Sequence, residues 1–276
     1  MTTTEMTQAS LPNARIGLAW RIDGETVRRN ARLILLPTLT AAAVIGLWEA
    51  LVWIYQIPNA LLPAPSAVAL RVVDTLPFLA AHAVPTTLET IAGFLISLVL
   101  GIGLAVLICA SRLAREALYP NVVFFQLIPK IALAPLFIVW LGIGSESRVT
   151  FSVFISFFPV VVATLTGLTA VDRDLLRLCR AVGATGSKIY LKVRFPTAVP
   201  YIFSGLKIAI TFAMIGVIVG EFITAQSGLG YLILFAASQA EMSLIFASIA
   251  LLCVIGLALY GLVVLAEIIT LKRYGS

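Results

Sequence analysis

Residues 149–200 read VTFSVFISFFPVVVATLTGLTAV and then DRDLLRLCRAVGATGSKIYLKVRFPTAVP, an apolar window followed by a basic interruption. The window, Val149–Val171, is long enough to cross a bilayer as a helix, which needs about 20 predominantly apolar residues. The interruption that follows, residues 171–200, holds six of the nineteen Lys and Arg residues of the chain. This alternation predicts membrane-spanning segments joined by charged segments at the membrane surface.

The composition places the whole chain in the same class. Apolar residues make up 61% of the sequence and charged residues 12%, with a mean hydropathy of +1.06. Soluble domains are about half apolar and roughly a quarter charged, so these values indicate an integral membrane protein. Six charge-poor windows predict six spans: Leu33–Tyr55, Leu88–Ser111, Leu118–Leu141, Val149–Val171, Ser204–Ala225 and Ser243–Ile268.

The windows are apolar on every side, which favours helices over the alternating strands of a β-barrel. We therefore expect an all-α membrane protein with about six transmembrane helices. Residues 1–32 are polar and predict a cytoplasmic N-terminal extension, and residues 33–276 predict the transmembrane domain. No apolar core with a small-residue cleavage site precedes the first span, so we expect no cleaved signal peptide.

The basic residues predict the orientation, because cytoplasmic loops carry an excess of Lys and Arg. With the N-terminus inside, only Arg71 and Arg148 fall in outer loops, and Lys130 and Lys207 fall within windows. The other fifteen lie on the inner side: Arg15, Arg21, Arg28, Arg29, Arg32, Arg112, Arg115, Arg173, Arg177, Arg180, Lys188, Lys192, Arg194, Lys272 and Arg273. Both termini are therefore expected in the cytoplasm.

The net charge of +6 is explained by this inner-side bias and by the anionic lipids that it faces. Membrane lipid is thus an expected partner and nucleic acid is not. The three cysteines are scattered without paired spacing, so no metal site is predicted.

Residues 173–200 predict two short helices that meet at a glycine. Leu175, Leu178, Cys179 and Val182 lie at helical spacing on one apolar face, and Gly183 is suited to ending a helix. A second helix is expected from Ser187 to Arg194, with Ser187 as its N-cap, and it is halted by Pro196 and Pro200. From the residues alone, this segment is either an ordinary interfacial loop or a docking surface for a cytoplasmic protein.

The spacing in this segment resembles the EAA loop of ABC importer permeases. In that loop Glu-Ala-Ala is followed by three residues, a glycine, nine residues, and Ile-x-Leu-Pro. Gly183, Val193, Phe195 and Pro196 stand at the expected positions. Arg177, Leu178 and Cys179 stand where the family has Glu-Ala-Ala, so a base replaces the acid and a leucine replaces one alanine.

The resemblance extends from about Leu62 to the C-terminus and points to the nitrate/sulfonate/taurine permease group. Its motifs here are the segments at 62–66, 128–137, 140–144, 157–159 and 228–230, with Glu221. It implies the type I importer permease fold in a bacterial inner membrane, formed by two copies of the chain. It further implies an ATPase subunit, which would hold ATP and Mg²⁺, and an extracytoplasmic solute-binding protein. The chain itself is expected to bind no cofactor.

The resemblance also implies which residues couple transport to the ATPase, with Gly183 as the pivot of the segment. These are Leu175, Arg177, Leu178, Cys179, Arg180, Gly183, Ala184, Val193, Phe195 and Pro196. The solute is expected to be small and anionic or a vitamin precursor.

Ionisable residues inside apolar windows are candidates for function because charge is costly in the membrane. Lys207 and Glu267 lie near inner ends, where we expect them to reach water. Lys130 lies between Pro129 and Pro135, where broken backbone and water are expected. It either attracts an anionic solute or pairs with Glu221 or Glu89.

Glu221 precedes the Gly228–Gly230 turn and is a candidate for an outer gate or a binding-protein contact. Pro129, Lys130, Pro135 and Glu221 are thus the pathway candidates. The alternative function is an ion-coupled secondary transporter that uses Lys130, Glu89 and Glu221, although no inverted repeat is evident. An enzyme is not expected, because the only histidine, His82, lies in an outer loop away from a membrane serine and residues 183–188 lack the phosphate-loop spacing.

Overall fold

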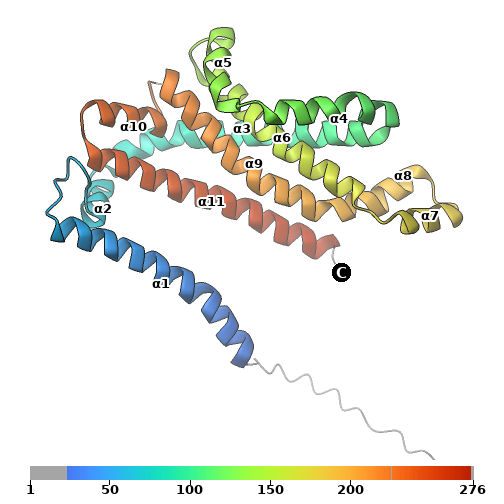
Figure 1. The fold of residues 1–276 in the computed structure, drawn as a ribbon, viewed down its shortest axis with the longest axis horizontal. Helices are drawn as coiled ribbons and strands as arrows, with labels where there is room; N and C mark the ends of the chain where they lie inside the picture. Colours follow the sequence, from blue (N-terminus) through green and yellow to red (C-terminus); the bar gives the residue numbers. More distant parts are fainter. Residues whose placement is uncertain (1–23, 225, 275–276) are drawn as a thin grey trace, which may run out of the picture. The chain divides into compact units, whose positions relative to one another are not determined.

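The structure is a computed structural model that describes residues 24–224 and 226–274. The elements within these residues are helical (Figure 1). The chain divides into two compact units, residues 1–51 and residues 52–276. Each unit is described by itself.

The first unit contains most of α1 (Gly24–Ile54), whose apolar part, Leu35–Ile54, is long enough to cross a membrane. The predicted extension of residues 1–32 falls partly outside the described residues, since these begin at residue 24. Residues 24–32 already belong to α1, so the helix begins before the apolar window does.

The core of the second unit is formed by α3 (Leu76–Ala110), α6 (Ser145–Thr169) and α9 (Phe195–Thr224). Small residues let these helices approach closely, as is common in membrane bundles. Ser152 of α6 lies between Gly93 of α3 and Gly216 of α9, where an added Cβ on either glycine would collide with it. The Ser152 hydroxyl also donates a hydrogen bond to the carbonyl of Ala213, at 2.9 Å.

Further helices cover this core at one end and along one side. α11 (Met242–Tyr274) packs beside α9, and α2 (Pro65–Asp74) and α10 (Leu229–Ser238) lie at the end where α11 begins (Figure 1). A buried apolar cluster joins α3, α10 and α11 through Leu79, Leu232 and Leu244. By the charge pattern, this is the outer end of the bundle.

The predicted third span is not one helix. It consists of α4 (Arg112–Leu127), the short 3₁₀ helix η1 (Lys130–Leu133) and α5 (Ala134–Leu141), and the chain bends by 89° between α4 and the rest. The bend falls at Pro129, as expected. Pro135 does not break a helix but lies in the first turn of α5, where its missing N–H has no intrahelical partner to lose. Among the described residues, five helices are long and apolar enough to span a membrane, or six when this bent pair counts as one span.

The basic segment forms α7 (Arg173–Ala181) and α8 (Gly186–Ile189), which lie at the end of the bundle opposite α10 (Figure 1). The prediction that the second helix stops at Pro196 is wrong. α8 continues through a π-helical turn, η2 (Tyr190–Arg194), directly into α9.

The π-helical turn explains why the prolines are tolerated. The Phe195 N–H reaches back five residues to the Tyr190 carbonyl, and the Thr197 hydroxyl donates to the Val193 carbonyl at 2.7 Å. The wider turn thus accommodates Pro196, which follows it directly and has no N–H to donate. The predicted Ser187 N-cap is also wrong, because the helix begins one residue earlier, with Thr185 in the cap position.

Candidate functional site: an exposed cytoplasmic helix and buried charges of the bundle

Helix α7 has a well-defined beginning and end. The Asp172 side chain accepts a hydrogen bond from the Asp174 N–H at 2.8 Å and caps the first turn. At the other end, Gly183 has φ +78°, and the Ala184 N–H donates to the Cys179 carbonyl at 2.9 Å. This is the positive-φ helix ending that glycine favours. Gly183 therefore ends the helix as the spacing predicts.

The predicted apolar face of α7 is exposed at three of its four positions, and Cys179 is half-buried. Leu175 is 44% exposed, Leu178 60% and Val182 75%. The basic residue Arg177 lies off this face and pairs with Asp174, its Nη1 lying 3.0 Å from a carboxylate oxygen. Arg180 is exposed as well. α7 thus presents a leucine and valine stripe, flanked by charge, on the cytoplasmic side.

The remaining coupling candidates lie deeper, where the segment joins the bundle. Val193 is in the π-helical turn, and Phe195 and Pro196 begin α9; all three are half-buried. Phe195 packs against the core cluster formed by α3, α6, α9 and α11. Since η2 and α9 are continuous, a displacement of α8 would be carried directly into a core helix.

Glu221 of α9 is buried at the outer end, with 1% of its surface exposed. One carboxylate oxygen accepts a hydrogen bond from the Thr86 hydroxyl at 2.6 Å, and the other accepts from the Gly230 N–H at 2.7 Å. The Leu229 N–H donates to the Thr86 hydroxyl, and the Gly228 N–H to Nδ1 of His82. Three successive N–H groups at the start of α10 are therefore held by side chains of α3 and α9.

His82 was expected in an outer loop, but it lies within α3. Its ring stacks with that of Tyr231, and this contact fixes it beside the start of α10. Thr86 was not identified from the sequence. The sequence offers only a weak indication of its role. Thr86 lies one helical turn before Glu89, at a depth in the membrane where polar groups need partners.

Arg148 and Glu89 form a buried ion pair between α6 and α3. Arg148 Nε lies 2.7 Å from one carboxylate oxygen of Glu89, and Nη2 lies 2.5 Å from the other. The assignment of Arg148 to an outer loop is therefore wrong, because it is in the first turn of α6 and 8% exposed. Arg71 alone then remains as an outer basic residue, so the predicted orientation is unaffected.

Lys130 lies at the bend between α4 and α5 and forms no ion pair within the described part of the chain. Its ammonium donates to the carbonyl of Gln126 at 2.9 Å and lies 5.1 Å from the centre of the Phe158 ring. The predicted alternative, a pair with Glu89 or Glu221, is wrong, since those carboxylates bond to Arg148 and to Thr86 and Gly230. The structure does not bring Lys130, Glu89 and Glu221 together as an ion-coupled site would require.

Lys207 and Glu267, which we expected to reach water separately, bond to each other. The ammonium of Lys207 on α9 lies 2.9 Å and 3.1 Å from the two carboxylate oxygens of Glu267 on α11. Both side chains are half-buried, so each charge is compensated by the other and neither side chain has to extend to water. No cluster of three potential metal ligands occurs among the described residues.

Comparison of the sequence with known protein families identifies the family of this chain. The model of the binding-protein-dependent transport system inner membrane component family matches residues 97–270. The chain belongs to this family and is a multi-pass inner membrane permease of the ABC importer class.

Two relatives illustrate how far the match extends. A probable ABC transporter permease of Haemophilus influenzae is 34% identical over 82% of this chain and 93% of the relative. The formylaminopyrimidine transport permease ThiX of Halalkalibacterium halodurans is 35% identical over 80% of this chain and 88% of the relative.

A solved structure shares the fold. The inward-facing MetNI methionine ABC transporter contains a chain that matches 75% of this chain and 96% of its own length, with a TM-score of 0.53 and 22% identity. The arrangement of helices is thus that of ABC importer permeases.

Proposed function

We propose that the chain works with a separate ATPase subunit, which docks on α7, and that two copies of the chain line the path of a small anionic solute. The observation that carries the docking assignment is the exposed apolar stripe of Leu175, Leu178 and Val182 on a short cytoplasmic helix. An apolar helix face favours insertion into a groove of another protein, where it can be buried.

The continuity of the segment supports a coupling role. Movement of α7 would act on α8, and α8 runs without interruption into α9. α9 in turn packs against α6 and α3 along the core. ATP-dependent movement of a docked subunit would therefore reach the helices that surround the transport path.

The anionic nature of the solute rests on Lys130. Lys130 lies at a broken span and pairs with no carboxylate among the described residues, so its ammonium is a suitable attraction point for an anion. One relative is named as an aliphatic sulfonates transport permease, SsuC of Bacillus subtilis, 28% identical over 79% of this chain. A binding protein outside the membrane would deliver the solute.

Affinity purification of the tagged chain from its native membrane tests the docking proposal. We expect a stoichiometric ATP-binding subunit to co-purify with the unaltered chain and to be lost with Leu178→Glu, which places a charge on the apolar stripe. Arg173→Ala is the matched control, since it changes an exposed residue of α7 that lies off the stripe and outside the coupling candidates, and it should retain the subunit. A chain that purifies alone and transports in liposomes without ATP would overturn the proposal in favour of a secondary transporter.

A further inference from the structure

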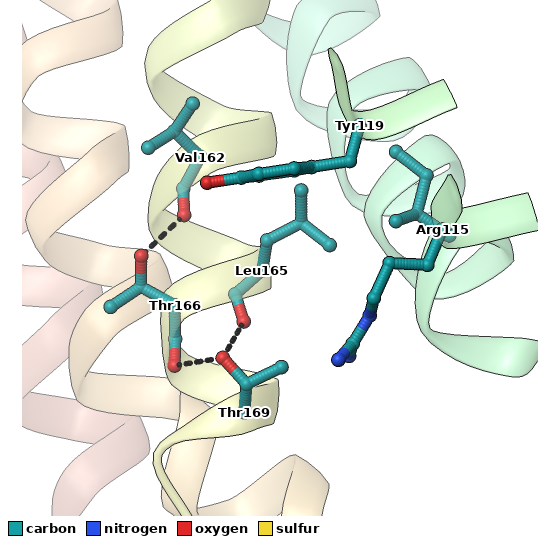
Figure 2. Close-up of a pocket in the computed structure, with 7 residues that line it drawn as sticks. Arg115, Tyr119, Val162, Leu165, Thr166 and Thr169 are labelled. Atoms are coloured by element: carbon teal, nitrogen blue, oxygen red, sulfur yellow. Dashed lines mark hydrogen bonds between the residues drawn. The ribbon is translucent and has the colours of Figure 1, made fainter. Parts of the chain in front are cut away.

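A partly polar pocket lies at the end of the bundle that the charge pattern predicts as cytoplasmic, and Lys130 is not among its lining residues. It has a volume of about 240 Å³ and is enclosed by the end of α3, the first turns of α4 and the end of α6 (Figure 2). Its lining residues are Ile108, Arg115, Tyr119, Val162, Leu165, Thr166 and Thr169. The predicted orientation puts this pocket at the depth of the inner-leaflet headgroups.

Arg115 carries a positive charge into this pocket without a counter-charge. Within the described residues it forms no ion pair, and its recorded polar contact is with the sulfur of Cys109 at 3.9 Å. Its neighbour Arg112 is different, because it pairs with Glu116 at 2.8 Å. Figure 2 shows the Arg115 guanidinium pointing across the pocket toward Thr169.

The two threonine hydroxyls of the pocket use their protons within α6. The Thr166 hydroxyl donates to the Val162 carbonyl and the Thr169 hydroxyl to the Leu165 carbonyl, both at 2.8 Å, so these carbonyls already have partners. Tyr119 points its hydroxyl toward the α6 backbone near Val162 (Figure 2). Arg115 and Tyr119 are thus the lining side chains that have donors to offer an anion.

We propose that this pocket binds the phosphate of an anionic phospholipid from the cytoplasmic leaflet. Arg115 provides the planar donor pair that matches phosphate oxygens, and Tyr119 adds a hydroxyl donor. Ile108, Val162 and Leu165 form an apolar wall beside them, along which an acyl chain can lie. A soluble phosphate ion would offer the same oxygens to Arg115 and Tyr119. The apolar wall favours a lipid, because only a lipid has an acyl chain to lie along it.

Native mass spectrometry of the delipidated full-length protein, with its associated subunits in detergent, tests this site. The probes are phosphatidylglycerol, phosphatidylcholine with the same acyl chains, and inorganic phosphate. We expect phosphatidylglycerol to bind preferentially and Arg115→Gln to weaken it about tenfold, equal to about 1.4 kcal/mol. Arg115→Lys should retain part of the affinity for phosphatidylglycerol, because it keeps the positive charge and loses the planar donor pair of the guanidinium.

The matched control is Arg112→Gln, which removes a basic residue from the same helical turn and the same leaflet. It should change phosphatidylglycerol binding by less than about twofold, because Glu116 already neutralises Arg112. Arg115 is exposed, so its variants should remain folded and monodisperse. Three results would each overturn the proposal: equal binding of both lipids, an unchanged affinity in Arg115→Gln, or displacement of phosphatidylglycerol by equimolar inorganic phosphate.

Discussion

Arg148 binds both carboxylate oxygens of Glu89, and both side chains are about nine-tenths buried between α6 and α3. Two parallel hydrogen bonds fix the orientation of the two side chains relative to each other, and the two opposite charges compensate each other. The pair lies in the outer half of the same helices that Ser152 brings close together. It therefore ties two core helices at a depth where an uncompensated charge is costly.

Breaking this pair should destabilise the bundle strongly. Arg148→Met leaves the Glu89 carboxylate buried without its partner, which costs about 3–5 kcal/mol for buried pairs. The double variant Arg148→Met with Glu89→Leu should recover most of that loss, because both charges are removed. Thermal unfolding in detergent measures this, with Arg112→Met at the exposed pair as a control of little effect. An Arg148→Met protein as stable as the unaltered one would contradict the assignment.

Gly228 should tolerate alanine less well than another positive-φ glycine. Its φ is +109°, and an added Cβ would collide with the carboxylate of Glu221. Gly142 has φ +82° with nothing near its Cβ position, so Gly142→Ala tests the backbone cost alone, roughly 1–3 kcal/mol. We expect Gly228→Ala to lower the unfolding temperature further than Gly142→Ala and to speed hydrogen exchange at residues 228–230. Equal effects would mean that Glu221 does not hold the turn.

A β-branched residue at Gly183 should uncouple the ATPase. Valine is strongly disfavoured at the φ of +78° found there, so Gly183→Val would change the turn between α7 and α8. We expect normal membrane insertion with loss of the ATP hydrolysis that loaded binding protein stimulates. Gly186→Val, three residues on, has open space around its Cβ and no positive φ, and should retain stimulation. Unchanged stimulation in Gly183→Val would rule out the pivot role.

Neutralising Lys130 should reduce uptake of an anionic solute. Loss of one charged contact corresponds to about a tenfold decrease in transport at limiting solute. Lys130→Ala should still co-purify with the ATPase subunit, because Lys130 lies at the bend between α4 and α5 and not on α7. Lys130→Arg, which keeps the charge, should retain much of the uptake. Radiolabelled solute uptake into proteoliposomes measures the effect. Normal uptake by Lys130→Ala would leave Lys130 with a packing role over Phe158 alone.

The sequence predicted the helical class well because the bilayer imposes one requirement on every span. Backbone polar groups in lipid must be satisfied internally, so long apolar windows become helices whatever their neighbours are. The helix ending at Gly183 was predictable for a similar local reason. The bend at Pro129 was also predictable, since proline removes a hydrogen bond within its own turn.

Predictions failed where the outcome depends on more than one segment. Pro196 and Pro200 were expected to stop a helix, but α8 continues through a π-helical turn into α9. Ser187 was expected to cap a helix that begins with Thr185 in that position. The prolines and the serine are each compatible with more than one backbone conformation. The neighbouring turns decide which conformation forms.

By itself, the sequence determined the class of protein, its apolar spans and the apolar face of α7, because these depend on composition and on residues close in the chain. Tertiary structure alone decided the partners of the membrane charges. Glu89 meets Arg148 across 59 residues, and Glu221 meets Thr86 across 135. A buried charge requires some partner, but which one it finds depends on how α3, α6 and α9 pack, and packing is a property of the folded bundle.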